Sequence, residues 1–402
     1  MSKVLILGAG QAGGSVAGFL KQYGFEGAII LVGDEALAPY QRPPLSKAWL
    51  KGDASEESLQ LKTTSFYADN GIDLRLALSA SRIDRAAKTV HFNDGSSETY
   101  DHLVIATGSR ARRLPIPGCD DAGLLELRTT VDAERLKQAL GAGKRLAVIG
   151  GGYVGLEAAA SARALGAEAV VIERMDRVLQ RVASETLSTT FTARHRLEGV
   201  DIRTGVEVSS VSSSSITLSN GEVIAADAVL VGIGALANEE LAKEAGLECA
   251  DGIMVDLEAR TSDPAIFAVG DVTRRPLPHY AGRLHRLESV PNAIEQAKQV
   301  ACALTGRPAP APEVPWFWSD QYDAKLQIAG LPFEAMSQVV RGDPDSGSFA
   351  VFHLNGDQIV CVEAVNAAQS FMFGKQAIAR STPIDSIRLA DEAVPIKQAV
   401  AD

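Results

Sequence analysis

Two glycine-rich segments have the residue types and the spacing that can hold a pyrophosphate. The first, at residues 8–13, follows the apolar run 4–7, and the second, at 150–155, follows the apolar run 145–149. In each segment the first glycine allows a tight turn, the second lets the backbone approach a phosphate, and the third lets helix and strand pack closely. These glycines are Gly8, Gly10 and Gly13 in the first segment and Gly150, Gly152 and Gly155 in the second. The N-terminus of the helix that follows would stabilise the phosphate charge.

An acidic residue follows each glycine segment by about 20 positions, as ribose recognition requires. Glu35, next to Asp34, comes after the apolar strand 28–32, and Glu173 comes after the apolar strand 169–172. A carboxylate there accepts hydrogen bonds from ribose hydroxyls. A single glycine motif also occurs in unrelated α/β domains, but the full strand, turn, helix and acid pattern occurs twice here. We therefore expect two dinucleotides, one tightly held flavin (FAD) and one exchangeable nicotinamide (NADH).

The surrounding pattern predicts the elements that position these residues. Helices are predicted at 14–23, 156–165 and 288–304, and further buried strands that run into glycine at 102–108, 228–232 and 265–270. The proline-rich loop 39–47 cannot form regular helix. The serine-rich stretch 209–215 is interpreted as a solvated turn between strands. After the stiff linker 306–312, short strands such as 326–330 and 349–353 indicate a third, mainly β module with some helix.

The repeated strand–turn–helix design predicts an α/β protein with two Rossmann-like dinucleotide-binding domains and a C-terminal α+β domain. The predicted boundaries are 1–112 for the first part of the FAD-binding domain, 113–234 for the NAD-binding domain, 235–308 for the second part of the FAD-binding domain, and 309–402 for the C-terminal domain. A length of 402 residues accommodates this organisation.

Composition excludes several other classes of protein. The formal net charge is −11 and there is no basic block, so nucleic acid and anionic membrane surfaces are poor partners. No apolar run is long enough to span a membrane, and the N-terminus lacks the pattern of a signal peptide, so we expect a cytoplasmic protein. The cysteines are scattered, which favours reduced thiols and predicts no metal site; they are Cys119, Cys249, Cys302 and Cys361.

Several motifs, taken in order along the chain, resemble the two-dinucleotide-domain flavoproteins with the glutathione reductase fold. Besides the two glycine segments, these are Ala106-Thr107-Gly108 and Val269-Gly270-Asp271. Within that superfamily, residues 41–47 (QRPPLSK), 288–293 (ESVPNA) and 316–322 (WFWSDQY) resemble the FAD-dependent NADH:ferredoxin reductases of P450 and ring-hydroxylating oxygenase systems. The resemblance covers essentially the whole chain. One departure is Ala237 before Asn238, where the family usually has proline; this substitution could loosen the loop.

The resemblance implies a role for each matching residue. Glu35 would bind the adenosine ribose of FAD, Asp271 the ribitol chain, and Lys47 would lie near the flavin N5 edge, paired with Glu157 beside the nicotinamide. Further flavin contacts implied are Arg42, Ala106, Thr107, Val290 at the start of a helix, and Trp318 beside the flavin ring. More ordinary interpretations stay open: a surface lysine for Lys47, a solvated helix residue for Glu157, and a core aromatic for Trp318.

The same resemblance bears on the reaction. Disulfide reductases of the superfamily carry a cysteine pair soon after the first glycine motif, whereas here no cysteine precedes Cys119. Electrons would therefore leave reduced FAD directly, one at a time, for a [2Fe–2S] ferredoxin. A rubredoxin reductase, or a redox-sensing flavoprotein resembling apoptosis-inducing factor, stays an alternative. Glu173 favours NADH over NADPH, although the neighbouring Arg174 could accept a 2′-phosphate.

A basic segment is the expected docking site for an acidic ferredoxin. Because the chain itself is acidic, docking requires a local positive patch. The segment 279–286 contains Arg283 and Arg286 and lies just before the predicted flavin-contacting motif. We expect the protein to act as a monomer or a weak homodimer.

Overall fold

The computed structural model describes residues 2–120 and 123–401, and the chain forms two compact units. Unit 1 comprises Met1–Arg42, Glu56–Arg110 and Leu236–Pro315, and unit 2 comprises Pro43–Ser55, Ala111–Ala235 and Trp316–Asp402. The strands β8 (Ser109–Ala111) and β16 (Ala235–Ala237) contain two of the points at which the chain passes from one unit to the other. The domain boundaries expected from the sequence stay a prediction.

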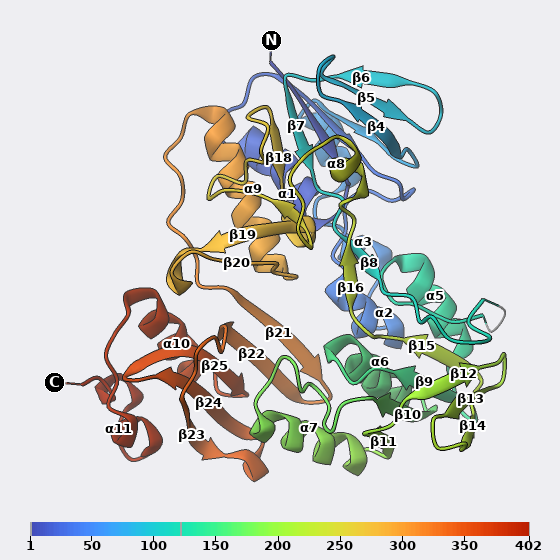
Figure 1. Cartoon of the computed structure of the whole chain (residues 1–402), viewed down its shortest axis with the longest axis vertical. Coiled ribbons are helices and arrows are strands. Elements are labelled where there is room, and N and C mark those ends of the chain that lie inside the picture. Colours follow the sequence, from blue (N-terminus) through green and yellow to red (C-terminus); the bar gives the residue numbers. More distant parts are fainter. Residues whose placement is uncertain (1, 121–122, 402) are drawn as a thin grey trace. The chain divides into compact units, whose positions relative to one another are not determined.

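Unit 1 is built on a parallel five-stranded sheet in the order β18-β7-β1-β2-β3 (Figure 1). Its strands are β1 (Lys3–Leu7), β2 (Ala28–Val32), β3 (Ile72–Arg75), β7 (His102–Ile105) and β18 (Ile266–Ala268). Continuous apolar runs such as Val4–Leu7 form its central strands because both faces of the sheet are covered. The glycine turn 8–13 lies at the carboxyl end of β1, where ligands of open α/β sheets bind.

One face of this sheet is covered by α1 (Gln11–Gln22) and α9 (Val290–Thr305), which pack against each other. Ser289 caps α9 by accepting the Asn292 N–H, and Gly306 ends it with a φ of +68°. The other elements of unit 1 are α3 (Glu56–Leu59), α4 (Thr64–Asp69), α8 (Glu240–Glu244), η2 (Gly270–Val272), η3 (Pro278–Tyr280), and the strands β4 (Ala80–Asp84), β5 (Thr89–Phe92), β6 (Ser97–Thr99), β17 (Ile253–Met254), β19 (Thr273–Leu277) and β20 (Arg283–His285). The antiparallel β4-β5-β6 sheet covers the opposite face of the parallel sheet.

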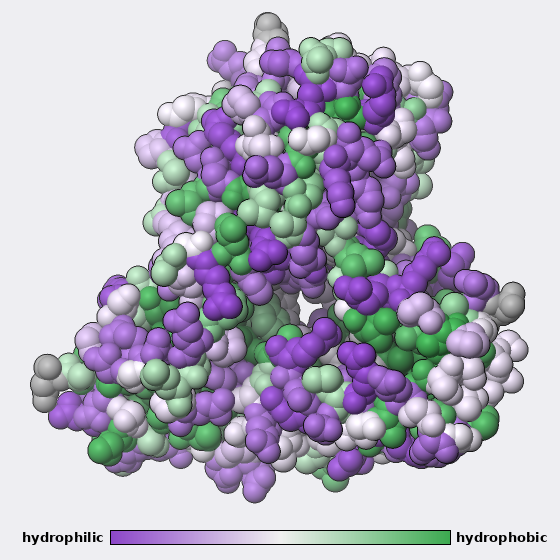
Figure 2. Space-filling view, viewed as in Figure 1, coloured by the Kyte–Doolittle hydropathy of each residue, from purple (hydrophilic) through white to green (hydrophobic). Residues whose placement is uncertain are grey.

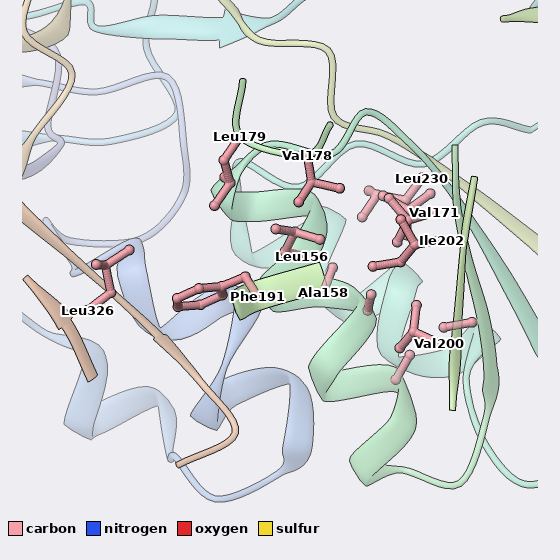
Figure 3. Packing of buried hydrophobic residues seen from close by; sticks show 14 of the residues in the cluster. Leu156, Ala158, Val171, Val178, Leu179, Phe191, Val200, Ile202, Leu230 and Leu326 are labelled. Atoms are coloured by element: carbon pink, nitrogen blue, oxygen red, sulfur yellow. The ribbon is translucent and has the colours of Figure 1, made fainter. Parts of the chain in front are cut away.

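Unit 2 repeats this design with a parallel sheet in the order β11-β10-β9-β15. Its strands are β9 (Arg145–Ile149), β10 (Glu168–Glu173), β11 (Val200–Thr204) and β15 (Ala228–Val231). The helices α5 (Thr130–Ala139), α6 (Tyr153–Ala164) and α7 (Glu185–Leu197) share a core with one face, and the antiparallel strands β12 (Val208–Val211), β13 (Ser215–Leu218) and β14 (Val223–Ala225) cover the other. Figure 3 shows Leu156, Val171 and Phe191 in this core.

The last part of unit 2 is a five-stranded antiparallel sheet in the order β21-β22-β25-β24-β23. Its strands are β21 (Trp316–Gln321), β22 (Ala324–Gly330), β23 (Ser337–Asp343), β24 (Ser348–Asn355) and β25 (Gln358–Val365). The remaining elements are η1 (Pro43–Ser46), α2 (Ala48–Lys51), η4 (Pro344–Ser346), α10 (Ala368–Arg380), α11 (Ser386–Ala390) and η5 (Ile396–Gln398). Leu326 of this sheet belongs to the same core as Phe191 (Figure 3).

The predicted fold class is confirmed: two Rossmann-like folds and a C-terminal α+β part. Two boundaries were wrong by three residues, since α1 and α6 begin inside the glycine segments, at Gln11 and Tyr153. The reason is that such a turn enters the helix directly. The serine-rich stretch was misjudged in part, because Ser209, Ser210 and Ser215 belong to β12 and β13, where neighbouring Val208, Val211 and Ile216 are buried.

The surface of the described chain is mixed in character. Hydrophilic side chains cover much of the face drawn in Figure 2, with hydrophobic side chains scattered among them. Within residues 2–120 and 123–401, no helix has both the length and the apolar character needed to cross a membrane. The same residues contain no cluster of three or more His, Cys, Asp or Glu side chains that could hold a metal ion.

Candidate active site

In the glycine turn of unit 1, neighbouring atoms leave no room for a side chain at two of the three glycines but do leave room at the other one. Gly8 has a φ of +112°, and a Cβ there would lie 2.2 Å from the Ala106 carbonyl oxygen. A Cβ on Gly13 would lie 1.9 Å from the Gly8 carbonyl oxygen. A Cβ on Gly10 would have Nη2 of Arg42, at 4.0 Å, as its nearest atom among the described residues other than its chain neighbours. The backbone at Gly10 is therefore accessible at the N-terminus of α1, which fits an anionic pyrophosphate.

Glu35 is held by two side chains of the loop that follows β2. Nη2 of Arg42 lies 2.6 Å from Oε1 of Glu35, and the Tyr40 hydroxyl donates to Oε2 at 2.6 Å. The guanidinium also donates to the Tyr40 hydroxyl at 3.2 Å. Burial opposes the charged form of Arg42, but Tyr40 and Glu35 outweigh it, and the net pKa of the guanidinium is raised. Arg42 thus stays a cation next to the accessible Gly10 backbone.

The other sequence-predicted flavin contacts of unit 1 follow its strands or lie in or at the start of helices. Asp271 belongs to η2 and accepts a hydrogen bond from the Ser109 hydroxyl at 3.1 Å, while Val290 is the first residue of α9. The Thr107 hydroxyl donates to the Asn238 backbone carbonyl at 2.9 Å, and the Asn238 side-chain amide donates to the Thr107 backbone carbonyl at 2.9 Å. The alanine in place of the usual proline at position 237 therefore leaves this loop anchored through Asn238.

The glycine turn of unit 2 has the same pattern. Gly150 has a φ of +109° and a Cβ there would lie 2.4 Å from the Gly232 carbonyl oxygen. A Cβ on Gly155 would lie 2.4 Å from the Gly150 carbonyl oxygen. Around Gly152, no atom of the described chain comes within 4 Å of an added Cβ, beyond its immediate neighbours. This turn too leaves one backbone position accessible at the N-terminus of a helix, α6.

Glu173 of this second site is held by backbone groups. Its Oε2 accepts the Gly151 N–H at 2.7 Å and its Oε1 accepts the Met175 N–H at 2.8 Å. These bonds fix the carboxylate at the end of β10 beside the glycine turn. Arg174 points elsewhere: its side chain is 72% exposed and lies 3.7 Å from Glu207.

The most buried charged contact of the predicted site residues joins Lys47 to Glu157. Nζ of Lys47 lies 2.7 Å from Oε2 of Glu157, whose side chain is only 5% exposed. Oε2 also accepts from the Ser46 hydroxyl at 2.5 Å, and Oε1 accepts from the Ser319 hydroxyl at 2.6 Å. Three donors from two distant segments of the sequence thus surround the carboxylate, which compensates its burial.

Local structure explains how Lys47 reaches this position. The 3-10 turn Pro43–Ser46 ends directly before it, and Nζ also donates to the Pro43 carbonyl at 3.1 Å. The Ser161 hydroxyl of α6 donates to the Ser46 carbonyl at 2.6 Å, which ties the turn to the helix that carries Glu157. The ordinary interpretations of a free surface lysine and a solvated glutamate are therefore wrong.

The tryptophans of β21 lie on one face of that strand. Trp316 and Trp318 are both half-buried, with ring centroids 5.7 Å apart. Trp316 also contacts Phe371 of α10 and lies under the Lys375 ammonium. Trp318 is thus not a fully buried core residue.

The predicted docking arginines belong to a larger positive cluster in unit 1. Arg283 is exposed on β20, whereas the Arg286 side chain is only 15% exposed and is paired with Glu288 and Asp251. Burial, together with the charges of Arg274, Arg283 and Arg286, lowers the pKa of His285 between them. The positive charge of the cluster therefore comes from its arginines and not from His285.

Sequence reasoning missed five residues that the structure connects to Glu157. Ser46 and Ser319 contact it directly; Gln321, His195 and Tyr322 continue from Ser319. Ser319 and Gln321 alternate along β21 and therefore share a face, but no strand was predicted there that could have revealed this. His195 lies in a helix without any motif, and only the tertiary structure brings it there.

Comparisons with known proteins agree with this architecture. Residues 2–297 match the pyridine nucleotide-disulphide oxidoreductase family, and residues 316–400 match the reductase C-terminal family. The probable ferredoxin reductase CtmF of Castellaniella defragrans is 49% identical over 98% of both chains. Putidaredoxin reductase CamA of Pseudomonas putida is 41% identical over 99% of this chain and 96% of the relative.

Solved structures of two reductases also match the chain over nearly its full length. Putidaredoxin reductase in a covalent complex with putidaredoxin matches with a TM-score of 0.96 and 41% identity, over 99% of this chain and 98% of that one. The ferredoxin reductase for the CYP199A2 system from Rhodopseudomonas palustris matches with a TM-score of 0.95 and 39% identity, over the full length of both chains.

The chain belongs to the pyridine nucleotide-disulphide oxidoreductase family, as a flavoprotein reductase with the additional reductase C-terminal domain. Its cofactors are FAD and NAD(H), and the two accessible glycine turns with their carboxylates fit two dinucleotides. All four cysteines are free, with Cys302 and Cys361 buried and the other two half-buried.

Proposed function

We propose that this reductase takes a hydride from NADH onto FAD and passes single electrons to a [2Fe–2S] ferredoxin that serves a P450 or a ring-hydroxylating oxygenase. The observation that carries the proposal is the full-length similarity to reductases named for such acceptors, including putidaredoxin reductase bound to putidaredoxin. A related protein of Pseudomonas putida, at 38% identity, is named rubredoxin-NAD(+) reductase, which keeps a rubredoxin as the second candidate.

A reconstitution assay separates these acceptors. NADH-dependent reduction of cytochrome c would be measured with a [2Fe–2S] ferredoxin, with a rubredoxin, and with neither. The proposal expects the ferredoxin to raise the rate well above the other two. A faster rate with the rubredoxin would replace the ferredoxin as the partner. A protein that reduces neither would be better described as a redox-sensing flavoprotein.

In unit 1 the residues around the glycine turn bind FAD. The Gly10 backbone and the N-terminus of α1 receive the pyrophosphate, between the tight turn at Gly8 and the close packing at Gly13. Glu35 accepts the adenosine ribose hydroxyls while Arg42 supplies positive charge. Further contacts come from strand and helix ends, at Ala106, Thr107, Asp271 and Val290.

In unit 2 the corresponding turn binds NADH through Gly150, Gly152 and Gly155, with Glu173 on the ribose. When bound, FAD supplies the chemistry by accepting a hydride and giving up electrons singly. Lys47 would supply a cation to stabilise the negative charge that the flavin gains on reduction, and Glu157 would orient that lysine. Trp318, which is half-buried, would offer an aromatic face to the flavin ring.

Stopped-flow reduction by NADH tests the roles of Lys47 and Glu157. We expect reduction to slow by about tenfold or more in Lys47→Ala, since a charge-assisted contact contributes about 1.5–3 kcal/mol. Glu157→Ala should also slow it, because the lysine loses its partner. Lys51→Ala is the matched control, as Lys51 is exposed and pairs weakly with Asp53 at 3.4 Å. Unchanged rates in both site variants would remove the pair from the mechanism.

The ferredoxin docks on the arginine cluster formed by Arg274, Arg283 and Arg286. Net charges of the same sign oppose the encounter, so a local positive patch must overcome them. Arg283→Glu and Arg286→Glu should raise the KM for ferredoxin while NADH reduction of the flavin stays intact. The wild-type KM should rise with salt, because the Debye length is about 8 Å at physiological ionic strength.

Arg82→Glu provides the charge-reversal control for the docking experiment, because Arg82 is an exposed arginine elsewhere in unit 1. Equal KM values in all three variants at low salt would place the docking surface elsewhere. A cytoplasmic location and a monomer or weak homodimer complete the proposal; sedimentation of the purified protein over a range of concentrations tests the oligomeric state.

A further inference from the structure

A buried chain of hydrogen bonds runs through unit 2 from Glu157 to the half-buried Tyr322. The Ser319 hydroxyl lies 2.6 Å from Oε1 of Glu157, and Nε2 of Gln321 lies 3.1 Å from Oγ of Ser319. Nε2 of His195 then lies 2.8 Å from Oε1 of Gln321, and the Tyr322 hydroxyl lies 3.0 Å from Nδ1 of His195. Ser319, Gln321 and His195 are each at most 1% exposed, so water does not compete for these groups.

The direction of the chain follows from which groups can donate. Burial lowers the pKa of His195, so the imidazole is neutral and has one N–H. Burial raises the pKa of Tyr322, so the phenol keeps its proton and donates to Nδ1. The histidine proton is therefore on Nε2 and is donated to the Gln321 carbonyl oxygen. The Gln321 amide then donates to Ser319, which leaves the Ser319 proton for Glu157.

The backbone conformation of Tyr322 indicates that surrounding contacts hold its side chain in place. Tyr322 lies in the two-residue turn between β21 and β22 with a φ of +56°, which bulky residues rarely adopt. Its ring stacks edge-on against His195, with centroids 5.0 Å apart, and the Arg194 guanidinium lies 5.4 Å from its centroid. Such conformations persist where surrounding contacts over-determine them, and they concentrate at functional sites.

We infer that Ser319, Gln321, His195 and Tyr322 form a positioning relay that fixes the Glu157 carboxylate and thereby holds Lys47. With Oε1 committed to Ser319, Oε2 alone faces Lys47 and Ser46, so the ammonium has one place to bind. These are positioning residues, because the relay acts through Glu157 and its outer members lie far along the hydrogen-bond chain from the reacting groups. The consequence for hydride transfer rests on the proposed function of the Lys47–Glu157 pair.

The experiment compares four variants of the FAD-loaded protein. Ser319→Ala removes the donor to Glu157, Ser319→Thr keeps a hydroxyl at that position, and Tyr322→Phe removes the outermost donor. Thr192→Ala is the matched control, since that hydroxyl donates within α7 to the Ser188 carbonyl. Two quantities are measured: the limiting rate of flavin reduction at saturating NADH, and the rate of Lys47 reductive methylation, followed by mass spectrometry.

In Ser319→Ala we expect Lys47 to be methylated several times faster and flavin reduction to slow by about threefold to tenfold, as for the loss of one hydrogen bond of about 1 kcal/mol. The Kd for NADH should stay close to wild type, so the effect falls on the limiting rate. Tyr322→Phe should show a smaller change of the same kind, and Ser319→Thr should recover most of the wild-type behaviour.

Three results would overturn the relay: unchanged Lys47 methylation in Ser319→Ala, equal defects in Ser319→Ala and Ser319→Thr, or a Thr192→Ala variant as impaired as Ser319→Ala. The second of these would mean that packing, and not the hydroxyl, matters. Faster methylation with an unchanged reduction rate would support the positioning relay and reject the proposed role of the Lys47–Glu157 pair. Thermal unfolding of each variant identifies any loss of fold.

Discussion

The two glycine turns share one backbone design but hold the carboxylates that we propose to bind ribose by different means. In both turns the first glycine has a φ near +110°, at +112° for Gly8 and +109° for Gly150, and the second glycine is open. Glu35, however, is bound by the side chains of Arg42 and Tyr40, which come from the loop after β2. Glu173 is bound by the N–H groups of Gly151 and Met175, which belong to the turns themselves.

We propose that this difference affects how long each cofactor stays bound. In unit 1, Nη2 of the cationic Arg42 side chain lies 4.0 Å from the position that a Cβ on Gly10 would occupy. A pyrophosphate bound at this turn would also contact that cation. In unit 2 the Glu173 carboxylate is held by backbone N–H groups, and Gly152 has open space before it. The first arrangement suits a retained flavin and the second an exchanging nicotinamide.

The largest effect is expected when the open glycine of unit 1 receives a side chain. Gly10→Ala should weaken FAD binding by about 100-fold, or about 2.8 kcal/mol, because the methyl group occupies the approach of the pyrophosphate. Flavin content and the apparent Kd from reconstitution of the apoprotein would be measured. Gly18→Ala, in the interior of α1 with open space around it, is the control and should bind FAD normally. A Gly10→Ala protein that is as yellow as wild type would contradict the proposed site.

The same substitution in unit 2 should act on a different ligand. Gly152→Ala should keep its flavin but raise the Kd for NADH by about tenfold, which is about 1.4 kcal/mol. Titration of the protein with the unreactive oxidised nucleotide would measure this. Loss of flavin from Gly152→Ala would mean that the two turns do not serve separate cofactors.

Removing the side chain over the first site should have a moderate effect. Arg42→Leu should increase the FAD dissociation rate by about tenfold, since a charge-assisted contact contributes about 1.5–3 kcal/mol. Flavin fluorescence, which rises as FAD is released, follows this rate. Arg82→Leu removes an exposed arginine that lies 3.6 Å from Asp84 in the same unit and is the control. Equal release from both variants would show that Arg42 does not retain the flavin.

A smaller effect is expected on the choice of nucleotide. NADH should give a higher kcat/KM than NADPH, because the Glu173 carboxylate repels a 2′-phosphate. Glu173→Ala should reduce that preference by several-fold. Arg174→Ala should change NADPH kcat/KM little, because the arginine is exposed and oriented toward Glu207. A wild-type preference for NADPH, together with its loss in Arg174→Ala, would reverse the assignment.

The smallest effects should come from the cysteines. Burial raises the pKa of the Cys361 thiol well above its usual range and that of Cys249 to about 11, so both are protonated at neutral pH. A protonated thiol is a poor nucleophile. Replacing each of the four cysteines by alanine should leave the rate of ferredoxin reduction within a few-fold of wild type. Loss of flavin reduction in a folded variant would reveal a thiol step.

The sequence was informative where local chemistry determines structure. The glycine turns require short side chains and positive φ angles, so both sites could be predicted together with the buried strands that lead into them. Lys47 and Glu157 came from a resemblance, since 110 positions separate them along the chain and nothing local pairs them. His195 could not be predicted, because a histidine within a helix has no pattern until tertiary packing places it against Gln321. Arg286 was identified by its charge and its place before the 288–293 motif, and its partners Glu288 and Asp251 emerged only in the structure.

The alternation along β21 limits how this protein can be recombined with its relatives. Trp316 and Trp318 occupy one face of the strand and Ser319 and Gln321 are on alternate positions of the other, so the two sets exchange faces if the strand shifts by one residue. A single inserted or deleted residue within 317–320 would therefore move either the tryptophans or Ser319 and Gln321 to the opposite face, depending on which end of the strand keeps its pairing with β22. Chimeras that exchange the C-terminal sheet should be joined in the proline-rich segment 308–315, upstream of Trp316, where a length change leaves this registration intact.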